Sequence, residues 1–437
     1  MHKQRNAKKI AIVGSGISGL TSAYLLSRRH QVTLYEGNDY LGGHTATVDV
    51  SVDGREIAVD TGFIVFNDRT YPNFIELMQQ ANVQMQATEM SFSVQNQATG
   101  LEYNGHSVST LFAQRRNIFS LQFYRFIREI LRFNGLAKES AAQEEGKHLA
   151  TLGDFLDKHD FSDYFADHYI LPMVAAIWSA SVSSCRDFPL SFFLRFFQNH
   201  GLLDIRNRPQ WYVIKGGSRS YIPALTEPLT DIRLNTPVIS VKRIDEKVEI
   251  IYQEHGADPT TAIFDEVIFA CHSDQALRLL SDPSASEQNI LGRMEYREND
   301  VVLHTDAQML PKEKRALASW NYWLDSNSAD LPSVTYSMNI LQGLETESPV
   351  CVTLNRTADI NPEKILRQFT YAHPVFTADS IAAQKQRSEI CGHQHTHFCG
   401  AYWANGFHED GVKSALEVCQ RFDERIAYPT TLEASGT

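Results

Sequence analysis

The chain has 437 residues, of which 43% are hydrophobic and 21% are charged, and its formal net charge is -12. This length exceeds what one simple core usually holds, so we expect two domains, and the composition is typical of a folded protein. The negative charge argues against non-specific nucleic-acid binding, which needs a basic surface. The six cysteines lack the spacing of a disulfide framework, which favours a reducing cytoplasm.

Two apolar stretches and the basic N-terminus are the segments that could indicate secretion or membrane contact. The segment MHKQRNAKK leads into a short apolar run that ends in glycines, so it does not resemble a secretory signal. Residues 169–185 form the longest uncharged run, which contains Pro172 and predicts a buried helix rather than a span. Residues 115–135 mix phenylalanines with arginines, as in helices that lie on a bilayer, line an acyl tunnel or pack a helical core. We therefore expect a cytoplasmic protein, with peripheral contact to the inner membrane face as one interpretation.

The first elements predict a dinucleotide site. Residues 9–14 read as a buried strand, 17–29 as a helix and 30–36 as a second strand, which together form a β-α-β unit. Gly14, Gly16 and Gly19 fit G-x-G-x-x-G, which permits a tight turn, a close approach of pyrophosphate and close helix packing. Glu36 ends the second strand, where a carboxylate accepts hydrogen bonds from an adenosine ribose. This pattern alone does not distinguish NAD from FAD.

The rest of the chain predicts a nucleotide-binding domain assembled from separate segments. Residues 66–204 are mostly helical in pattern, strand signals return at 231–253 and 264–273, and a mixed region follows from 291. The C-terminal part again shows a strand, a glycine turn and a helix. We expect residues 8–65, 205–290 and 388–427 in the nucleotide-binding domain, 66–204 and 291–387 in a substrate domain, and 428–437 as a loose tail.

Three motifs resemble those of the flavin-containing amine oxidase and phytoene desaturase superfamily: EGNDYLGGHTATV after the ribose acid, VDTGFIVFN beyond it, and FCGAYWANGFHEDGVKSAL near the C-terminus. In that superfamily an arginine commonly follows the second glycine pair, and His44 stands there in this chain. The resemblance implies an α/β fold, with a Rossmann-type FAD-binding domain of the glutathione-reductase-like, amine-oxidase type and an interleaved α+β substrate domain. It also implies non-covalent FAD.

The resemblance assigns further residues to FAD. The strand NTPVISVKRI implies that the backbone of Val238 holds the adenine, and the C-terminal motif implies an acid and a helix N-terminus near the ribityl chain and the ring. The complete expected cofactor set is Gly14, Ser15, Gly16, Ile17, Ser18, Gly19, Glu36, Gly37, Gly42, Gly43, His44, Thr45, Gly62, Phe63, Val238, Gly400, Glu409, Asp410, Gly411 and Val412.

The expected catalytic residues are less sharply defined. Many amine oxidases hold water at the flavin with a lysine on a substrate-domain strand, and the corresponding strand ENDVVLHTDAQMLP has His304 but no lysine. We expect His304 to face the site, or else to be an ordinary solvent-facing strand residue. The segment YAHPVF adds Tyr371 and His373 as further candidates. The cluster CGHQHTHFC alternates possible ligands on a strand, but it leads directly into the flavin motif, so we expect no metal.

Within the superfamily the chain most resembles bacterial predicted NAD/FAD-binding proteins associated with cyclopropane or branched fatty-acid synthesis. That resemblance implies an FAD-dependent oxidoreductase that oxidises or desaturates a hydrophobic, fatty-acyl or lipid-linked substrate by hydride transfer to flavin N5, with oxygen, a quinone or another carrier as acceptor. The alternatives are an amine oxidase that releases hydrogen peroxide and a flavoprotein partner without turnover.

Overall fold

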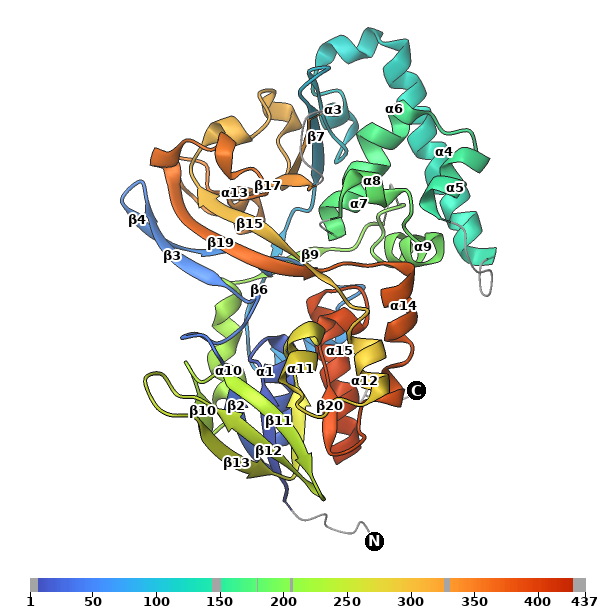
Figure 1. Ribbon diagram of the computed structural model, residues 1–437. Coiled ribbons are helices and arrows are strands. Elements are labelled where there is room, and N and C mark those ends of the chain that lie inside the picture. Colours follow the sequence, from blue (N-terminus) through green and yellow to red (C-terminus); the bar gives the residue numbers. More distant parts are fainter. Residues whose placement is uncertain (1–6, 144–150, 179, 205–206, 326–330, 427–437) are drawn as a thin grey trace, which may run out of the picture.

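The computed structural model describes residues 7–143, 151–178, 180–204, 207–325 and 331–426, so the expected tail at 428–437 lies outside the described residues. Figure 1 shows two halves, one above the other, and the first and last described segments both lie in the lower half. The segments that form the lower half come from the beginning, the middle and the end of the sequence.

The lower half is built on a five-stranded parallel sheet. Its order is β10 (Asp231–Arg233), β2 (Gln31–Tyr35), β1 (Lys9–Val13), β14 (Glu266–Phe269) and β20 (Thr396–Phe398). The inner strands are buried along nearly their whole length, which explains their uninterrupted apolar sequence. Helices α1 (Ile17–Leu26) and α15 (His408–Cys419) pack against each other in the same core. The α/β Rossmann-type fold is thereby confirmed.

A three-stranded antiparallel sheet lies beside the parallel one. It consists of β11 (Val238–Ile244), β12 (Lys247–Tyr252) and β13 (Thr260–Phe264), and its inward side chains join the same core. Arg243 on β11 connects the two sheets, because its guanidinium donates to Asp282, to Glu287 and to the Thr396 hydroxyl of β20. Arg243 and Glu287 have side chains only 7% and 5% exposed.

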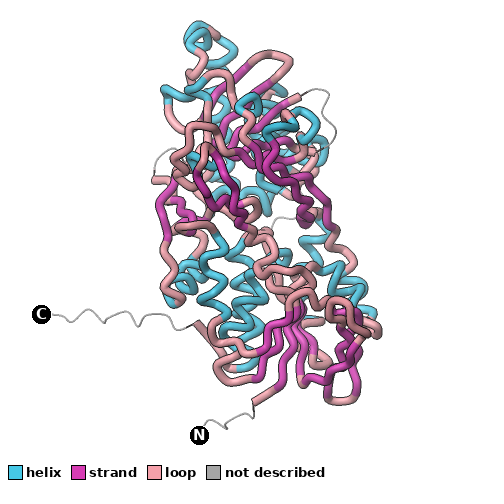
Figure 2. The backbone as a smooth tube through the Cα atoms, turned by 90° about the vertical axis from the view of Figure 1, so that its left-hand side faces the viewer, coloured by secondary structure: helices cyan, strands magenta, loops and turns pink. Residues whose placement is uncertain are grey.

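The upper half contains a seven-stranded mixed sheet covered by helices. Its order is β19 (Ile365–Pro374), β15 (Tyr296–His304), β18 (Cys351–Leu354), β17 (Ser333–Ser337), β16 (Trp320–Leu324), β7 (Phe92–Asn96) and β8 (Leu101–Asn104). The helices α4 (Leu121–Gln143), α5 (Leu152–Lys158), α7 (Leu171–Trp178) and α9 (Leu190–Asn199) bury a phenylalanine-rich core beside it. In the other view, Figure 2, strands and helices of this half again lie close together.

Two segments pack differently from the domain boundaries that the sequence suggested. The hairpin β3 (Thr47–Val52) and β4 (Arg55–Asp60) packs its valines against β15 and β18 of the upper sheet. Helix α2 (Pro72–Gln80), assigned to the substrate domain from sequence, instead packs its buried side chains in the lower core. Between them lies a small sheet of β5 (Phe66–Asn67), β9 (Trp211–Ile214) and β6 (Met85–Thr88).

The remaining helices are short. They are α3 (Val108–Leu111), α6 (Asp163–Phe165), α8 (Val182–Cys185), α10 (Ile222–Thr226), α11 (Ser273–Leu279), α12 (Ala285–Leu291), α13 (Met338–Leu341) and α14 (Ala378–Gln384), with a 3-10 turn at Arg115–Phe119. Within the described residues, no helix has both the length and the apolar character needed to cross a bilayer.

The buried ion pair of Arg243 gives a test of the fold. Replacing Glu287 by Ala leaves a buried guanidinium short of one partner, so we expect a loss of about 3 kcal/mol in the free energy of unfolding. Urea denaturation measures this loss. The exposed pair Arg278–Asp274 provides the control, and Arg278→Ala should cost less than about 1 kcal/mol. Equal effects of the two substitutions would contradict this role of Arg243.

Candidate functional site

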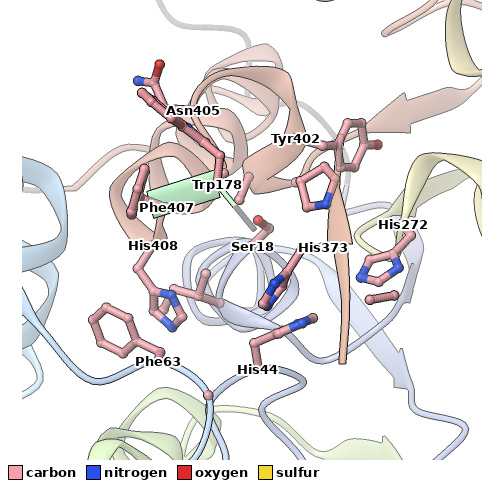
Figure 3. Close-up of a pocket in the computed structure, with 18 of the residues that line it drawn as sticks. Ser18, His44, Phe63, Trp178, His272, His373, Tyr402, Asn405, Phe407 and His408 are labelled. Carbon is pink, nitrogen blue, oxygen red and sulfur yellow. The ribbon is translucent and has the colours of Figure 1, made fainter. Parts of the chain in front are cut away.

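A cavity of about 300 Å³ lies between the two halves, and segments from all parts of the chain line it. The lower half contributes the turn before α1, the end of β14 and the start of α15, while the upper half contributes the end of β19 and the end of α7. Of the expected site residues, those that line the cavity are Gly16, Ile17, Ser18, Gly42, His44, Gly62, Phe63, His373 and Gly400. Figure 3 shows the lining side chains converging from these elements.

The glycine turn leaves open space at one position and none at another. A Cβ on Gly16 would meet no atom within 4 Å, whereas a Cβ on Gly19 would lie 2.0 Å from the carbonyl oxygen of Gly14. Gly14 itself has φ +103°, which other residues rarely adopt. The structure therefore needs Gly14 and Gly19 for the turn and for helix packing, and it leaves the space above Gly16 clear for a ligand.

Two helix N-termini reach the cavity. Gly16, Ile17 and Ser18 at the start of α1 line it, and so does His408 at the start of α15. The first amides of a helix have no partner within the helix and carry partial positive charge, so they suit phosphate oxygens and an electron-rich ring. The two helices touch where the Ser18 hydroxyl donates to the Gly411 carbonyl at 3.0 Å. These features fit a dinucleotide such as FAD.

The ribose acid is held in place beside the same turn. One carboxylate oxygen of Glu36 accepts from the amide of Ser15 at 3.0 Å, and the other accepts from the amide of Asn38 at 3.0 Å. Gly37 lies against Pro237, the residue before Val238, and a Cβ on Gly37 would be 3.7 Å from the proline Cβ. Residues 36–37 and 237–238 thus meet at one edge of the sheet, where the resemblance implies the adenosine.

Four histidines line the cavity, and burial lowers the pKa of each. The pKa falls to about 4 for His272 and to about 3 for His373, and it is also lowered for His44 and His408. In His272 and His373 the neighbouring His44 lowers the pKa further. The ring centroid of His44 is 5.8 Å from that of His272 and 5.6 Å from that of His373. The four imidazoles are therefore neutral at pH 7.

His408 is fixed by its neighbours. Its Nε2 lies 3.1 Å from the Thr45 hydroxyl and 3.2 Å from the Tyr221 hydroxyl. Its ring is stacked on Phe63, with centroids 3.4 Å apart and planes at 11°. Thr45, an expected cofactor residue, is buried and orients this ring from behind rather than lining the cavity.

His44 and His373 are held in opposite tautomers. His44 donates to the carbonyl of Ala372, and its buried Nε2 has no hydrogen-bond partner, so Nε2 bears a lone pair. His373 accepts at Nδ1 from the amide nitrogen of Asn299 at 3.3 Å, so its proton is on Nε2. The ligand-free cavity therefore contains an acceptor on His44, whose ring lies beside that of His373 in Figure 3.

The structure corrects the expectation for His304, which faces neither the cavity nor solvent. His304 is fully buried, with Nε2 2.7 Å from the Thr353 hydroxyl and Nδ1 accepting from the amide of Asp306 at 3.0 Å. The last four residues of β15, Val301 to His304, are all buried, so both faces of the strand are covered there and the side chain at position 304 meets protein on either face. Both ring nitrogens of His304 thus make hydrogen bonds within the protein.

Tyr371 also lies behind the cavity rather than in its lining. Its hydroxyl is 2.9 Å from that of Thr61, its ring centroid is 5.4 Å from that of His44, and burial raises its pKa to about 12. Tyr371 thus supports His44 as a neighbour and is a positioning residue in this geometry.

The acids of the C-terminal motif do not line the cavity. Glu409 accepts from the amide of Phe74 at 2.9 Å and from Asn73, so it caps α2. Asp410 accepts from the amides of Asn405 and Phe407 at 3.1 and 3.0 Å, and burial raises its pKa to about 6. Val412 is core. These residues shape the loop that reaches the cavity, because their own hydrogen bonds are made within the protein.

Several lining residues were not predicted from sequence. His272 lies three residues beyond the end of β14, Phe407 immediately precedes α15, and His408 is the first residue of that helix. The carboxyl end of a parallel strand and the first residue of a helix after a glycine turn are places where binding residues gather, and this signal could have found them. Among the described residues, no group of three or more His, Cys, Asp or Glu side chains is arranged to hold a metal.

Gly16 gives the first test of this site. Gly16→Leu fills the open space without a clash, so we expect a folded protein that no longer retains flavin. Absorbance near ~450 nm follows the flavin, and thermal unfolding should shift by no more than about 4 °C. Gly19→Leu is the contrast, because its side chain meets backbone and should destabilise the fold. A yellow Gly16→Leu protein would contradict the assigned pyrophosphate position.

His44 gives the second test. To donate to a phosphate oxygen, as the usual arginine does, its Nε2 must gain a proton, and a nearby diphosphate would raise the pKa that burial lowers. The affinity for FAD should therefore rise as the pH falls from 8, by up to about tenfold for each pH unit. The rise should end once the pH is below the pKa of His44 in the ligand-free protein, which burial lowers from 6.5.

Fluorescence titration with FAD at several pH values measures this dependence, and calorimetry in two buffers measures proton uptake. His44→Gln should remove the dependence. His304→Gln, at a buried histidine outside the cavity, should retain it. A pH-independent affinity in the unaltered protein would exclude proton uptake at His44.

Comparison with known proteins agrees with this geometry. The profile described as flavin containing amine oxidoreductase matches residues 17–358. An L-amino-acid oxidase of Pseudechis australis is 23% identical over 340 residues, or 70% of this chain and 59% of the relative. A carotenoid phi-ring synthase of Chlorobaculum tepidum is 34% identical over 82 residues, or 18% of this chain and 12% of the relative. The chain thus matches less than two thirds of either curated relative.

Solved structures share the fold at low sequence identity. A fatty acid isomerase from P. acnes, described as producing CLA, has a TM-score of 0.68 at 14% identity, covering 96% of this chain and 100% of that one. Cyclohexylamine oxidase from Brevibacterium oxydans IH-35A has a TM-score of 0.65 at 14% identity, covering 95% and 100%. The glycine turn, the paired helix N-termini and the extent of the family match lead to one conclusion: the chain belongs to the flavin-containing amine oxidoreductase family, and its cofactor is FAD.

Proposed function

We propose that this FAD-dependent oxidoreductase oxidises or desaturates the acyl chain of a fatty-acyl or lipid-linked substrate. The observation that carries the proposal is the composition of the described cavity lining, which contains no Asp, Glu, Lys or Arg. Its ionisable side chains are histidines, tyrosines and one cysteine. In the ligand-free protein, burial lowers the pKa of all four histidines, so the cavity is uncharged at pH 7. A proton that His44 takes up with FAD would be balanced by the diphosphate.

An uncharged cavity favours an uncharged reacting group. A protonated amine that enters it would lose its hydration without gaining a carboxylate partner, which is costly in an apolar site. An alkyl segment gains free energy by leaving water for the same surface, at about 0.8 kcal/mol for each buried CH₂ group. The lining therefore supports oxidation of an alkyl segment in preference to a cationic amine.

A second chamber extends the apolar surface. It has a volume of about 160 Å³ and shares four lining residues with the first cavity, which are Val65, Ile177, Trp320 and Phe407. Its own walls are mostly aromatic and aliphatic, with Tyr103, Met173 and Phe196 among them. The two chambers together offer room for a chain longer than the flavin cavity alone holds, and this continuity supports a long acyl substrate.

The residues of this chain would bind, orient and shield such a substrate. When bound, FAD supplies a two-electron acceptor for the hydrogen of a substrate C–H bond. Trp178, Phe376 and Phe407 present apolar surface that excludes water from the cavity. That a fatty acid isomerase has this fold agrees with the proposal.

Anaerobic reduction of the bound flavin tests the proposal. Acyl substrates such as phospholipids or acyl thioesters should bleach the flavin absorbance, while putrescine and cyclohexylamine should not. Bleaching by amines alone would establish the alternative activity, an amine oxidase, and would overturn the acyl proposal. Lack of bleaching by any substrate of either class would favour a flavoprotein without turnover.

Ile177, at the junction of the two chambers, gives a more specific test. Ile177→Trp narrows the passage, so we expect a rise of about tenfold in the KM for long acyl chains, because several CH₂ groups lose their burial. Short acyl chains, which fit the first cavity alone, should keep their KM. Ile381→Trp, outside both linings, is the control. An equal effect on short and long chains would argue against use of the second chamber.

A further inference from the structure

The surface of the upper half carries an apolar patch. Its side chains are exposed although their types are usually buried: Phe119 is 89% exposed, Leu121 78% and Val108 76%. We define the docking patch as Val108, Ile118, Phe119, Leu121, Tyr124 and Leu131, all among the large exposed hydrophobic residues of the described chain. They belong to α3, the following 3-10 turn and the first part of α4, at the upper edge of the molecule in Figure 1.

Helix α4 has two faces, and the outer one is not that of an ordinary surface helix. One face buries Phe123, Phe126 and Phe133 in the core. The opposite face exposes Leu121, Tyr124, Arg125, Arg128, Leu131 and Arg132 at helical spacing. Apolar side chains interleaved with arginines on the outer face are typical of helices at a bilayer interface, where apolar groups enter the acyl region and guanidinium groups remain at the head groups.

The charge around the patch is opposite to that of the whole protein. Residues 105–135 contain five arginines and one acid, Glu129, whereas the full chain has a net charge of -12. Arg115, Arg116, Arg125 and Arg128 are exposed, and in the described part of the chain none of them forms an ion pair with a carboxylate. Arg115 donates to the Phe112 carbonyl and Arg116 to the Gly100 carbonyl. An anionic surface would provide the negatively charged partners that all four guanidinium groups lack among the described residues.

Part of the lining of the second chamber lies in the segment that leads into this patch. The lining includes Gly105 and His106, both exposed and only two or three residues before Val108. The 3-10 turn and α4 lie further along the same segment. An apolar chamber whose lining is exposed in the segment that carries a basic, apolar surface fits an amphipathic molecule held in a lipid layer.

We propose that the docking patch binds the surface of an anionic lipid bilayer, with Phe119 and Leu121 inserted among the acyl chains and the arginines at the phosphates. Docking does not depend on the proposed function, although loading of an acyl chain through the chamber rests on it. A second copy of the chain fits the patch poorly, because in a symmetric pair the arginines of one patch would face those of the other.

Sedimentation with vesicles tests the proposal on the FAD-loaded protein. The protein should pellet with vesicles of phosphatidylglycerol and phosphatidylcholine, and much less with phosphatidylcholine alone. The double substitution Phe119→Glu with Leu121→Glu should abolish pelleting. Arg125→Ala with Arg128→Ala should weaken it by at least about tenfold, since each arginine near an anionic surface contributes about 1 kcal/mol.

Matched controls lie in the lower half. Ile239→Glu makes the same kind of change at an exposed residue of β11, and Arg28→Ala with Lys242→Ala removes two exposed cations. Both should pellet like the unaltered protein, and retention of flavin absorbance confirms folding in every variant. Docking is measured by sedimentation and not by activity. Failure of acyl substrates to bleach the flavin would therefore contradict only the proposed reaction, not the docking proposal.

Two outcomes would overturn the docking proposal. The first is an unaltered protein that stays in solution with anionic vesicles. The second is an unaltered protein that forms an oligomer and does not bind vesicles, together with a Phe119→Glu, Leu121→Glu variant that is a monomer. The patch would then be an interface between protein chains.

Discussion

The contact between α1 and α15 determines where the whole site forms. A Cβ on Gly411 would lie 2.7 Å from Ile17 and 3.0 Å from the Ser18 hydroxyl, so the first turn of α15 can approach the first turn of α1 only because residue 411 is glycine. This contact brings together segments from opposite ends of the sequence and points both helix N-termini into one cavity. The cavity, its electrostatics and its position between the two halves all follow from that approach.

The part of the site that depends on local geometry was predictable, and the part that depends on tertiary packing was not. Gly14, Gly16, Gly19 and Glu36 lie within one β-α-β unit, so their spacing alone predicted their arrangement. His304 was placed wrongly because both faces of β15 are covered over its last four residues, which depends on tertiary packing and leaves no trace in the pattern of residues. Glu409 matches a flavin motif, yet it caps α2, a helix whose packing in the lower half the sequence did not indicate.

Histidines give the cavity polar groups without charge. An arginine in place of His44 would bring a permanent positive charge, whereas a buried imidazole stays neutral until an anion compensates it. The close spacing of His44, His272 and His373 strengthens this effect, because protonation of one ring disfavours protonation of the next. The site is thus suited to hold a diphosphate in a cavity whose described lining has no Asp, Glu, Lys or Arg.

The late position of α15 has a consequence for biosynthesis. The glycine turn of α1 is translated well before the amides that face it from Gly400 to His408, because most of the described chain separates the two segments. A nascent chain therefore has only half of the coenzyme site until the second segment has been translated, and the complete site can bind the coenzyme only after that point.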